Sequence, residues 1–218
     1  MIGFVVALYR EAEYFLNSLN DLKKAVLAGK TVYTGKVCGK DFALILSGIG
    51  KVNAALATQA LIDAYKPEFI INFGTAGGAN ENVKHLSYYL VEKCCQYDFN
   101  LSELDDVSVG FIEGYNTVHF DCKIDGLDFM DKAILGTADM FSNKIENINT
   151  VRSLSCDLRD MEGGAIAEVC ASNDYPLYMI KGVTDTYDNP AKQFYDNLIA
   201  VCKGFPEIIN SVIKALCR

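Results

Sequence analysis

Short apolar runs alternate with segments of helical periodicity along most of the sequence, and this alternation limits the folds that the chain can adopt. Residues 2–8 (IGFVVAL), 68–74 (EFIINFG) and 177–184 (LYMIKGVT) have the length and composition of buried strands. Between them lie segments with apolar residues at helical spacing, such as 10–19 (REAEYFLNSL). The sequence therefore predicts an α/β fold, a three-layer α/β/α sandwich around a mixed central sheet.

Other segments extend this scheme, with one exception. Two strands joined by a hairpin are predicted within 30–48, further strands at 86–95 and 132–139, and helices at 50–65 and 193–216. The glycine-rich stretch 74–80 is predicted to be a loop. Residues 96–132 give mixed signals and are assigned no element. Half of the 218 residues are hydrophobic, which is enough for one core, so a single domain spanning 1–218 is expected.

Charge and composition exclude several classes of partner. The formal net charge is -8 and lysines and arginines form no cluster, which argues against nucleic acid and anionic membranes and favours a small-molecule partner. The apolar start at 1–8 is too short for a signal peptide or a membrane span, so a cytoplasmic protein is expected. The eight cysteines include no C-x-x-C and are expected to be reduced. His85 and His119 lie at no metal-ligand spacing, so no metal site is expected.

Two glycine-containing stretches, SGIGKV at 47–52 and FGTAGG at 73–78, suggest nucleotide binding but lack the required spacing. In 47–52 (SGIGKV), Val52 follows the lysine where a phosphate loop needs Ser or Thr. Asn53 stands where the dinucleotide fingerprint needs its third glycine. No nucleotide cofactor is therefore expected, and the plain explanation of these glycines is tight turning of the chain.

Residues able to do chemistry follow several predicted strands. Glu11, Thr75, Phe141 and Asp185 each come near the end of a different strand, and ligand sites in α/β sheets gather at the carboxyl ends of strands. Each residue also has an ordinary explanation. Glu11 can favour a helix dipole, Asp185 can cap a helix and Phe141 can belong to the core. The position of these residues predicts a shared rim without fixing its function.

The joint order of six segments is more specific. VALYREAE, SGIGKVNAA, INFGTAGG, ADMFSN, RDMEGGAIAEVC and GVTDTYDN resemble, in this order, the purine nucleoside phosphorylase and nucleosidase superfamily. Within it, the sequence is most similar to the nucleosidases of 5'-methylthioadenosine and S-adenosylhomocysteine. The resemblance implies hydrolysis of the N-ribosidic bond of a purine nucleoside, which releases adenine and a 5-thio-substituted ribose. It also implies a homodimer.

The resemblance assigns roles to individual residues. Glu11 activates the attacking water, and Asp185 donates a proton to purine N7. Breaking this bond builds positive charge on the sugar and negative charge on the base, so an acid at the base and anionic groups at the sugar suit the reaction. Asp185 must then hold a proton, which burial among Ile180, Val183 and Phe141 would favour. Glu11 must stay ionised.

The remaining site residues follow from the same resemblance. Glu162 binds the ribose hydroxyls beside Met161, Phe141 stacks on the base, and the Ser142 backbone meets the edge of the base. Asp160 is expected to be structural. Apart from the resemblance, the place of Thr75 in the glycine-rich stretch predicts that it adds a hydroxyl and a backbone N–H to a cavity. Apolar residues suited to a 5'-thioether, which belong to the core by default, are Leu8, Ile49 and Phe194.

Alternatives remain at this point. A phosphorylase needs cations for phosphate, and of the four arginines only Arg10 is expected to reach the site. Phosphorylases of the superfamily typically carry an arginine where this sequence has Asn72, so water is favoured as nucleophile. A nucleoside-binding module without turnover and an aminofutalosine-type substrate are the other possibilities.

Overall fold

A mixed β-sheet forms the centre of the protein in a computed structural model, which describes residues 1–141, 144–186 and 190–217. Its strands are β1 (Ile2–Val6), β2 (Lys23–Leu27), β3 (Lys30–Val37), β4 (Lys40–Leu46), β5 (Phe69–Gly78), β6 (Tyr88–Gln96), β7 (Phe120–Asp121), β8 (Asp131–Thr137), β9 (Leu158–Asp160) and β10 (Leu177–Asp185). The helices are α1 (Tyr9–Asn17), α2 (Lys51–Tyr65), α3 (Ile145–Ser153), α4 (Gly163–Ser172) and α5 (Pro190–Leu216), with a 3₁₀ turn, η1 (Glu113–Tyr115).

The sheet is open on one side and closed on the other. From β5 it extends through β1, β4 and β3 to β2, with β1 parallel to both of its neighbours. In the other direction, β5 pairs with β9, β9 with β8, β8 with β6 and β6 with β10. Strand β10 also pairs with β5, so these five strands form a ring. Three parallel strands, β1, β5 and β10, therefore end close together.

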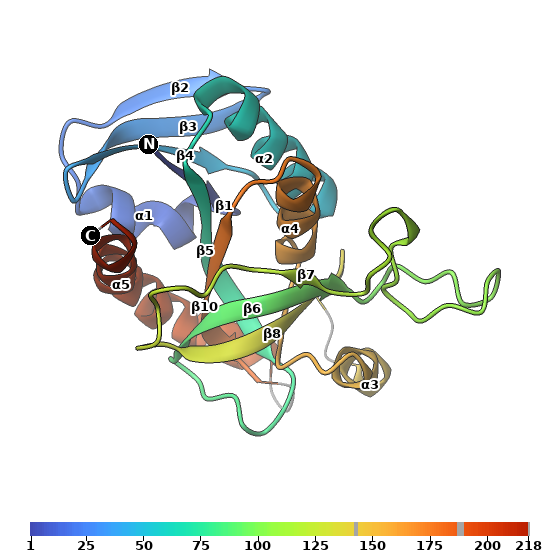
Figure 1. The fold of residues 1–218 in the computed structure, drawn as a ribbon. Helices are drawn as coiled ribbons and strands as arrows, with labels where there is room; N and C mark the ends of the chain where they lie inside the picture. Colours follow the sequence, from blue (N-terminus) through green and yellow to red (C-terminus); the bar gives the residue numbers. More distant parts are fainter. Residues whose placement is uncertain (142–143, 187–189, 218) are drawn as a thin grey trace.

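Helices cover both faces of the sheet (Figure 1). Helices α1 and α5 pack on one face, and α2 and α4 on the other. Successive residues of β1 serve the two layers, because Phe4 packs in the core beside α1 and α5 while Val5 faces the core beneath α2. This arrangement confirms the predicted three-layer α/β class with a mixed central sheet.

The structure corrects the prediction for the glycine-rich stretch. Gly74, Gly77 and Gly78 belong to strand β5 and not to a loop. Without a side chain, these glycines let other side chains approach the strand closely, since a Cβ on Gly74 would lie 3.1 Å from Glu11 Oε1. Gly77 leaves similar room for the Asp185 side chain.

Outside 96–132, strands β2 and β9 and helix α3 were not predicted, and 96–132 itself is mostly irregular. Strand β2 is an exposed edge strand, and β9 has three residues, so neither shows the apolar run of a buried strand. Helix α3 is short and largely polar. Residues 96–132 contain only η1 and β7 besides the ends of β6 and β8. Within the described part of the chain, no helix has both the length and the apolar character needed to cross a membrane.

Candidate active site

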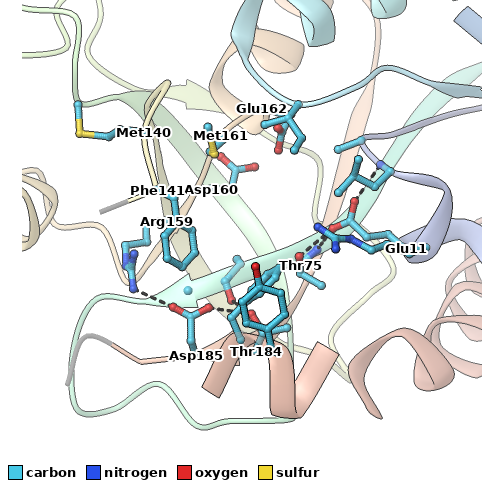
Figure 2. Close-up of a pocket in the computed structure, with 18 of the residues that line it drawn as sticks. Glu11, Thr75, Met140, Phe141, Arg159, Asp160, Met161, Glu162, Thr184 and Asp185 are labelled. Atoms are coloured by element: carbon cyan, nitrogen blue, oxygen red, sulfur yellow. Dashed lines mark hydrogen bonds and ion pairs between the residues drawn. The ribbon is translucent and has the colours of Figure 1, made fainter. Parts of the chain in front are cut away.

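A pocket of about 420 Å³ lies where β1, β5 and β10 end, a volume suited to a small-molecule ligand. Helices α1 and α4 begin at its wall (Figure 2). Of the residues predicted for the site, Ser142 lies outside the described residues. The others all line the pocket: Leu8, Glu11, Ile49, Thr75, Phe141, Met161, Glu162, Asp185 and Phe194. The structure thus brings them together, while their roles remain predictions.

The carboxylate of Glu11 is held by three hydrogen bonds. Oε1 accepts from the Thr75 backbone N–H at 2.7 Å and from the Thr75 hydroxyl at 2.8 Å. Oε2 accepts from the Leu8 N–H at 3.1 Å, where the chain enters α1. Only 5% of Glu11 is exposed. These three donors fix the orientation of the carboxylate, so the local geometry suits a positioned base. It also gives α1 the N-terminal cap expected of an acid at this position.

Asp185 ends β10 and forms a buried ion pair with Arg159 of β9. Arg159 Nη2 donates to Asp185 Oδ2 at 2.8 Å, and the Thr184 hydroxyl donates to Oδ1 at 2.8 Å. Burial raises the pKa of Asp185 above its usual value, while the guanidinium and the Thr184 hydroxyl lower it. The net direction favours a protonated carboxyl. The surroundings differ from the expected apolar ones, since a cation lies at the carboxyl and Phe141 is 53% exposed.

Gly77 of β5 makes room for this ion pair. A Cβ at Gly77 would lie 2.8 Å from Asp185 Oδ2 and 2.9 Å from Arg159 Cζ. Contacts this short do not occur, so a side chain here would displace both partners. The glycine that looked like a turn residue in the sequence is a packing requirement of the acid and its arginine.

Glu162 stands at the start of α4 and lines the pocket apart from the other two acids (Figure 2). Its Oε1 accepts from the Gly50 N–H at 2.8 Å, and Gly50 has φ +95°, a conformation that favours glycine. Burial and the nearby Asp160 raise the pKa of Glu162 to about 8, although Gly50 and Lys181 act in the opposite direction. A carboxyl that is largely protonated near neutral pH can donate one hydrogen bond and accept others, as a diol requires.

Asp160 holds together the strands and the helix that surround the pocket. Its Oδ2 lies 2.9 Å from the Lys181 ammonium and accepts from the Gly163 N–H at 2.8 Å, and Oδ1 accepts from the Thr137 hydroxyl at 2.5 Å. Burial alone would lower the pKa of Lys181, but the surrounding carboxylates hold it above its usual value. These contacts join β8, β9, β10 and α4. They support the structural role expected for Asp160.

Aromatic rings form the outer wall of the pocket. The Phe141 and Phe194 ring centroids lie 5.8 Å apart in an edge-to-face arrangement. The guanidinium of Arg10 lies 5.7 Å from the Phe194 ring centroid, and that of Arg159 lies 6.0 Å from the Phe141 ring centroid. A flat, partly exposed ring beside the acid suits stacking on a base.

Comparison with known proteins places this geometry in a family. Residues 1–214 match the sequence model of the phosphorylase superfamily. The chain belongs to this superfamily. Two curated members, both named 5'-methylthioadenosine/S-adenosylhomocysteine nucleosidase, resemble it over most of their length. The protein of Listeria innocua serovar 6a is 30% identical over 216 residues, and the match covers 91% of each chain. The protein of Buchnera aphidicola subsp. Acyrthosiphon pisum strain Tuc7 is 31% identical over 228 residues, and that match covers 99% of this chain and 98% of the relative.

A solved superfamily structure has the same fold. The 5'-methylthioadenosine/S-adenosylhomocysteine nucleosidase of Colwellia psychrerythraea 34H, in complex with adenine, superposes with a TM-score of 0.87 at 25% sequence identity. The match covers 98% of this chain and 95% of that one.

Arg159 is the main residue of this superfamily site that sequence reasoning missed. The sequence led to the expectation that only Arg10 among the arginines reaches the pocket, and this was wrong because Arg159 also lines it. The signal was its place in the sequence, because Arg159 directly precedes Asp160 and the Met161–Glu162 pair in the motif segment RDMEGGAIAEVC. Tyr97, Met140 and Tyr195 also line the pocket without having been predicted.

The spacing of the histidines in the sequence also did not reveal the neighbours of His119 in the fold. His119 is far in sequence from Cys95 and Cys156, but the fold brings ligand atoms of all three within 4.8 Å of one another. This cluster lies outside the residues that line the pocket.

Proposed function

We propose that the protein hydrolyses the N-ribosidic bond of a purine nucleoside, with 5'-methylthioadenosine, S-adenosylhomocysteine or both as substrate. The products are adenine and the 5-thio-substituted ribose. The observation that carries the proposal is the arrangement of three buried acids around one pocket. Glu11 with Thr75 and Asp185 with Arg159 lie on different sides, and Glu162 lies apart from both (Figure 2). The family and the activity named for its curated relatives support it.

Glu11 is the proposed base. A water molecule beside its carboxylate attacks the anomeric carbon of the ribose and gives a proton to Glu11. Thr75 and Leu8 hold the carboxylate in place through their N–H groups, so it is positioned before substrate binds. The Thr75 hydroxyl also donates to Glu11, and Thr75 lines the pocket. Its contribution is to orient the base.

Asp185 is the proposed acid. As the bond from the anomeric carbon to purine N9 breaks, its electron pair moves to the base, and Asp185 delivers a proton to N7. Burial raises the pKa of Asp185, which favours the proton-bearing form. Arg159 opposes this, so the ion pair limits the pH range over which the acid carries its proton.

Glu162 is the proposed ribose ligand. Its carboxyl takes the 2'- and 3'-hydroxyls, and the Gly50 N–H keeps the side chain pointed at the pocket. Negative charge on Glu11 stabilises the positive charge that develops on the sugar. Met161 packs beside the sugar, and Leu8, Ile49 and Phe194 line the wall where a 5'-thioether would lie. Phe141 stacks on the base.

Hydrolysis is favoured over phosphorolysis by the charges in the pocket. Arg159 and Lys181 are each paired with a carboxylate, at 2.8 and 2.9 Å. Asn72, at the position where phosphorylases typically carry arginine, donates its side-chain amide to the Val5 carbonyl at 2.9 Å. Arg10 is the remaining arginine on the described pocket wall. One exposed arginine among four carboxylates is a poor site for a phosphate dianion.

Base release with and without phosphate tests the proposal. The substrates are 5'-methylthioadenosine, S-adenosylhomocysteine, adenosine, inosine and aminofutalosine, and the sugar product is identified as ribose or ribose 1-phosphate. We expect phosphate-independent release, fastest for the 5'-thio substrates. Release only with phosphate would establish a phosphorylase. Tight binding of a nucleoside without any release would establish a binding module.

Three coarser expectations complete the proposal. The protein acts in the cytoplasm, folds as one domain and works as a homodimer. Exposed apolar side chains on one face of α2, Val52 and Leu56, support the dimer, since such residues favour burial at an interface. Light scattering at working concentration should give twice the chain mass of 24.0 kDa, and a monomer would refute the dimer.

A further inference from the structure

A second cluster of reactive side chains lies apart from the pocket. Cys95 is near the end of β6, Cys156 lies two residues before β9, and His119 directly precedes β7. Their ligand atoms all lie within 4.8 Å of one another, and the two Sγ atoms are 3.4 Å apart. Cys95 and Cys156 are fully or nearly fully buried. Nothing in the proposed reaction uses these residues.

The fold builds this cluster from three separate segments. Antiparallel pairing of Cys94 with Phe120 places the next residues, Cys95 and His119, beside each other at the β6–β7 edge. Gly136 of β8 lies beside Cys156, and a Cβ there would lie 3.4 Å from Cys156 Sγ. Strand β8 therefore packs directly against this thiol.

The imidazole is already oriented. His119 Nε2 lies 3.0 Å from the Leu154 carbonyl oxygen, so as Nε2–H it donates to that oxygen. This leaves Nδ1 with its lone pair as the ligating nitrogen. A metal-bound histidine almost always donates its other N–H to such an acceptor, which fixes the tautomer and the ring orientation.

We propose that Cys95, Cys156 and His119 form a zinc site. Zinc takes thiolate sulfur at about 2.3 Å and imidazole nitrogen at about 2.0–2.1 Å in tetrahedral geometry. Two sulfurs on one ion then lie about 3.8 Å apart, so the 3.4 Å separation requires only a small outward movement. Three protein ligands leave the fourth position for a water molecule.

Charge explains the choice of metal. Two thiolates, a neutral imidazole and Zn²⁺ sum to zero, so the loaded cluster carries no net charge into an apolar environment. The thiols pack among Ala79, Ala138 and Val151, where an unbalanced charge would be costly. Cu⁺ would leave a net negative charge with the same ligands. Hard cations such as Mg²⁺ prefer oxygen ligands, which this cluster lacks.

The site would stabilise the strand that carries Arg159. Cys156 is followed by Asp157, whose carboxylate accepts from the Ile134 N–H at 2.9 Å and from the Asn80 side chain at 2.9 Å. Strand β9 begins at the next residue. A metal bound here would join β6, β9 and the irregular segment before β7, so zinc should raise the melting temperature.

The other buried cysteine pair provides a matched control. Cys94 and Cys122 have Sγ atoms 4.0 Å apart in the core. Among the described residues, no third cysteine, histidine or acid lies close enough to join them as a metal ligand. Replacing Cys122 by serine removes a buried thiol that lies beside β6, the strand that carries Cys95, but leaves the three proposed ligands intact.

Zinc content and cobalt absorption test the proposal without an activity assay. The reduced full chain is loaded with Zn²⁺ and dialysed, and metal is measured in wild type, Cys156→Ser, His119→Asn and Cys122→Ser, with folding checked by circular dichroism. We expect about one zinc per chain in wild type and Cys122→Ser, and affinity at least about 100-fold lower in the two ligand variants. Co²⁺ added to wild type should give thiolate-to-cobalt charge-transfer absorption.

Any of three results would overturn the site. The first is wild-type protein that binds no stoichiometric zinc and shows no cobalt–thiolate absorption. The second is equal zinc binding by wild type, Cys156→Ser and His119→Asn. The third is a disulfide between Cys95 and Cys156 in metal-exposed protein, which would identify the pair as a redox couple.

Discussion

Arg159 Nη2 lies 2.8 Å from Asp185 Oδ2, and both side chains are almost completely buried. The proposed proton donor therefore has a permanent cation at one of its two oxygens. Because a neighbouring cation favours the ionised carboxylate, Arg159 lowers the pKa of Asp185 while burial raises it. The pH range of the reaction should depend on this pair.

Replacing Arg159 by glutamine should extend activity to higher pH. The change removes a group that lowers the pKa of Asp185, so the pKa rises and the acid keeps its proton at higher pH. In Arg159→Gln, the alkaline decline of kcat/KM for base release should therefore occur at a higher pH than in wild type. Arg10→Gln is the control, since Arg10 lies beside Phe194 and is not the arginine of the Asp185 ion pair. An unchanged alkaline decline would mean that Arg159 does not tune the acid.

Asp185→Asn should reduce turnover far more than binding. An asparagine cannot deliver a proton to N7, and general acid catalysis contributes on the order of 10²–10⁴-fold. Single-turnover base release and the Kd of an unreactive adenosine analogue are the two measurements. Turnover within a few-fold of wild type would remove Asp185 from the acid role. The double variant Asp185→Asn/Arg159→Gln checks whether an unpaired arginine contributes to the loss.

Glu11→Gln should block hydrolysis while preserving the fold. The amide keeps one oxygen for Thr75, but its nitrogen cannot accept from the Leu8 N–H, so a loss of about 1 kcal/mol in unfolding free energy is expected. Glu13→Gln on the same helix is the matched control, because Glu13 is outside the pocket lining. If both variants hydrolyse at the same rate, water is activated by another group.

Glu162→Gln should flatten the dependence of stability on pH. The pKa of Glu162 is raised from 4.5 to about 8, so the folded chain holds a proton that the unfolded chain releases. This contribution to stability is complete below about pH 4.5 and is lost as the pH rises to about 8, with a slope of at most about 1.4 kcal/mol per pH unit.

Urea denaturation across this range measures the difference between wild type and Glu162→Gln. As the pH rises, wild type should lose unfolding free energy relative to Glu162→Gln, and the difference between the two should level off above about pH 8. A constant difference would show that Glu162 titrates normally in the folded protein.

The sequence predicted the strands with long apolar runs and the order of the motif segments. Strands β1 and β10 are such cases, because burial on both faces leaves a continuous apolar signature. It could not predict that the glycines of β5 serve close approach, because a glycine in sequence looks the same in a turn and in a strand. That distinction depends on Glu11 and Asp185, which are distant in the chain.

Long-range pairing also explains the missed partners. Nothing near Asp185 in sequence indicates Arg159, because the two meet only through the pairing of β5 with both β9 and β10. The same holds for His119 and Cys95, which the β6–β7 register brings together. The motif residues were placed by resemblance, and the charges that surround them required the fold.

The ring of β5, β9, β8, β6 and β10 has a consequence for self-association. A closed ring of strands exposes few unpaired backbone groups, so the long strand left with a free edge in the described chain is β2. An exposed edge can pair with another chain and seed aggregates. Strand β2 carries Lys23 and Lys24 beside the exposed Val26, and such charges oppose edge-to-edge pairing. Neutralising these two lysines should therefore make the protein more prone to aggregate.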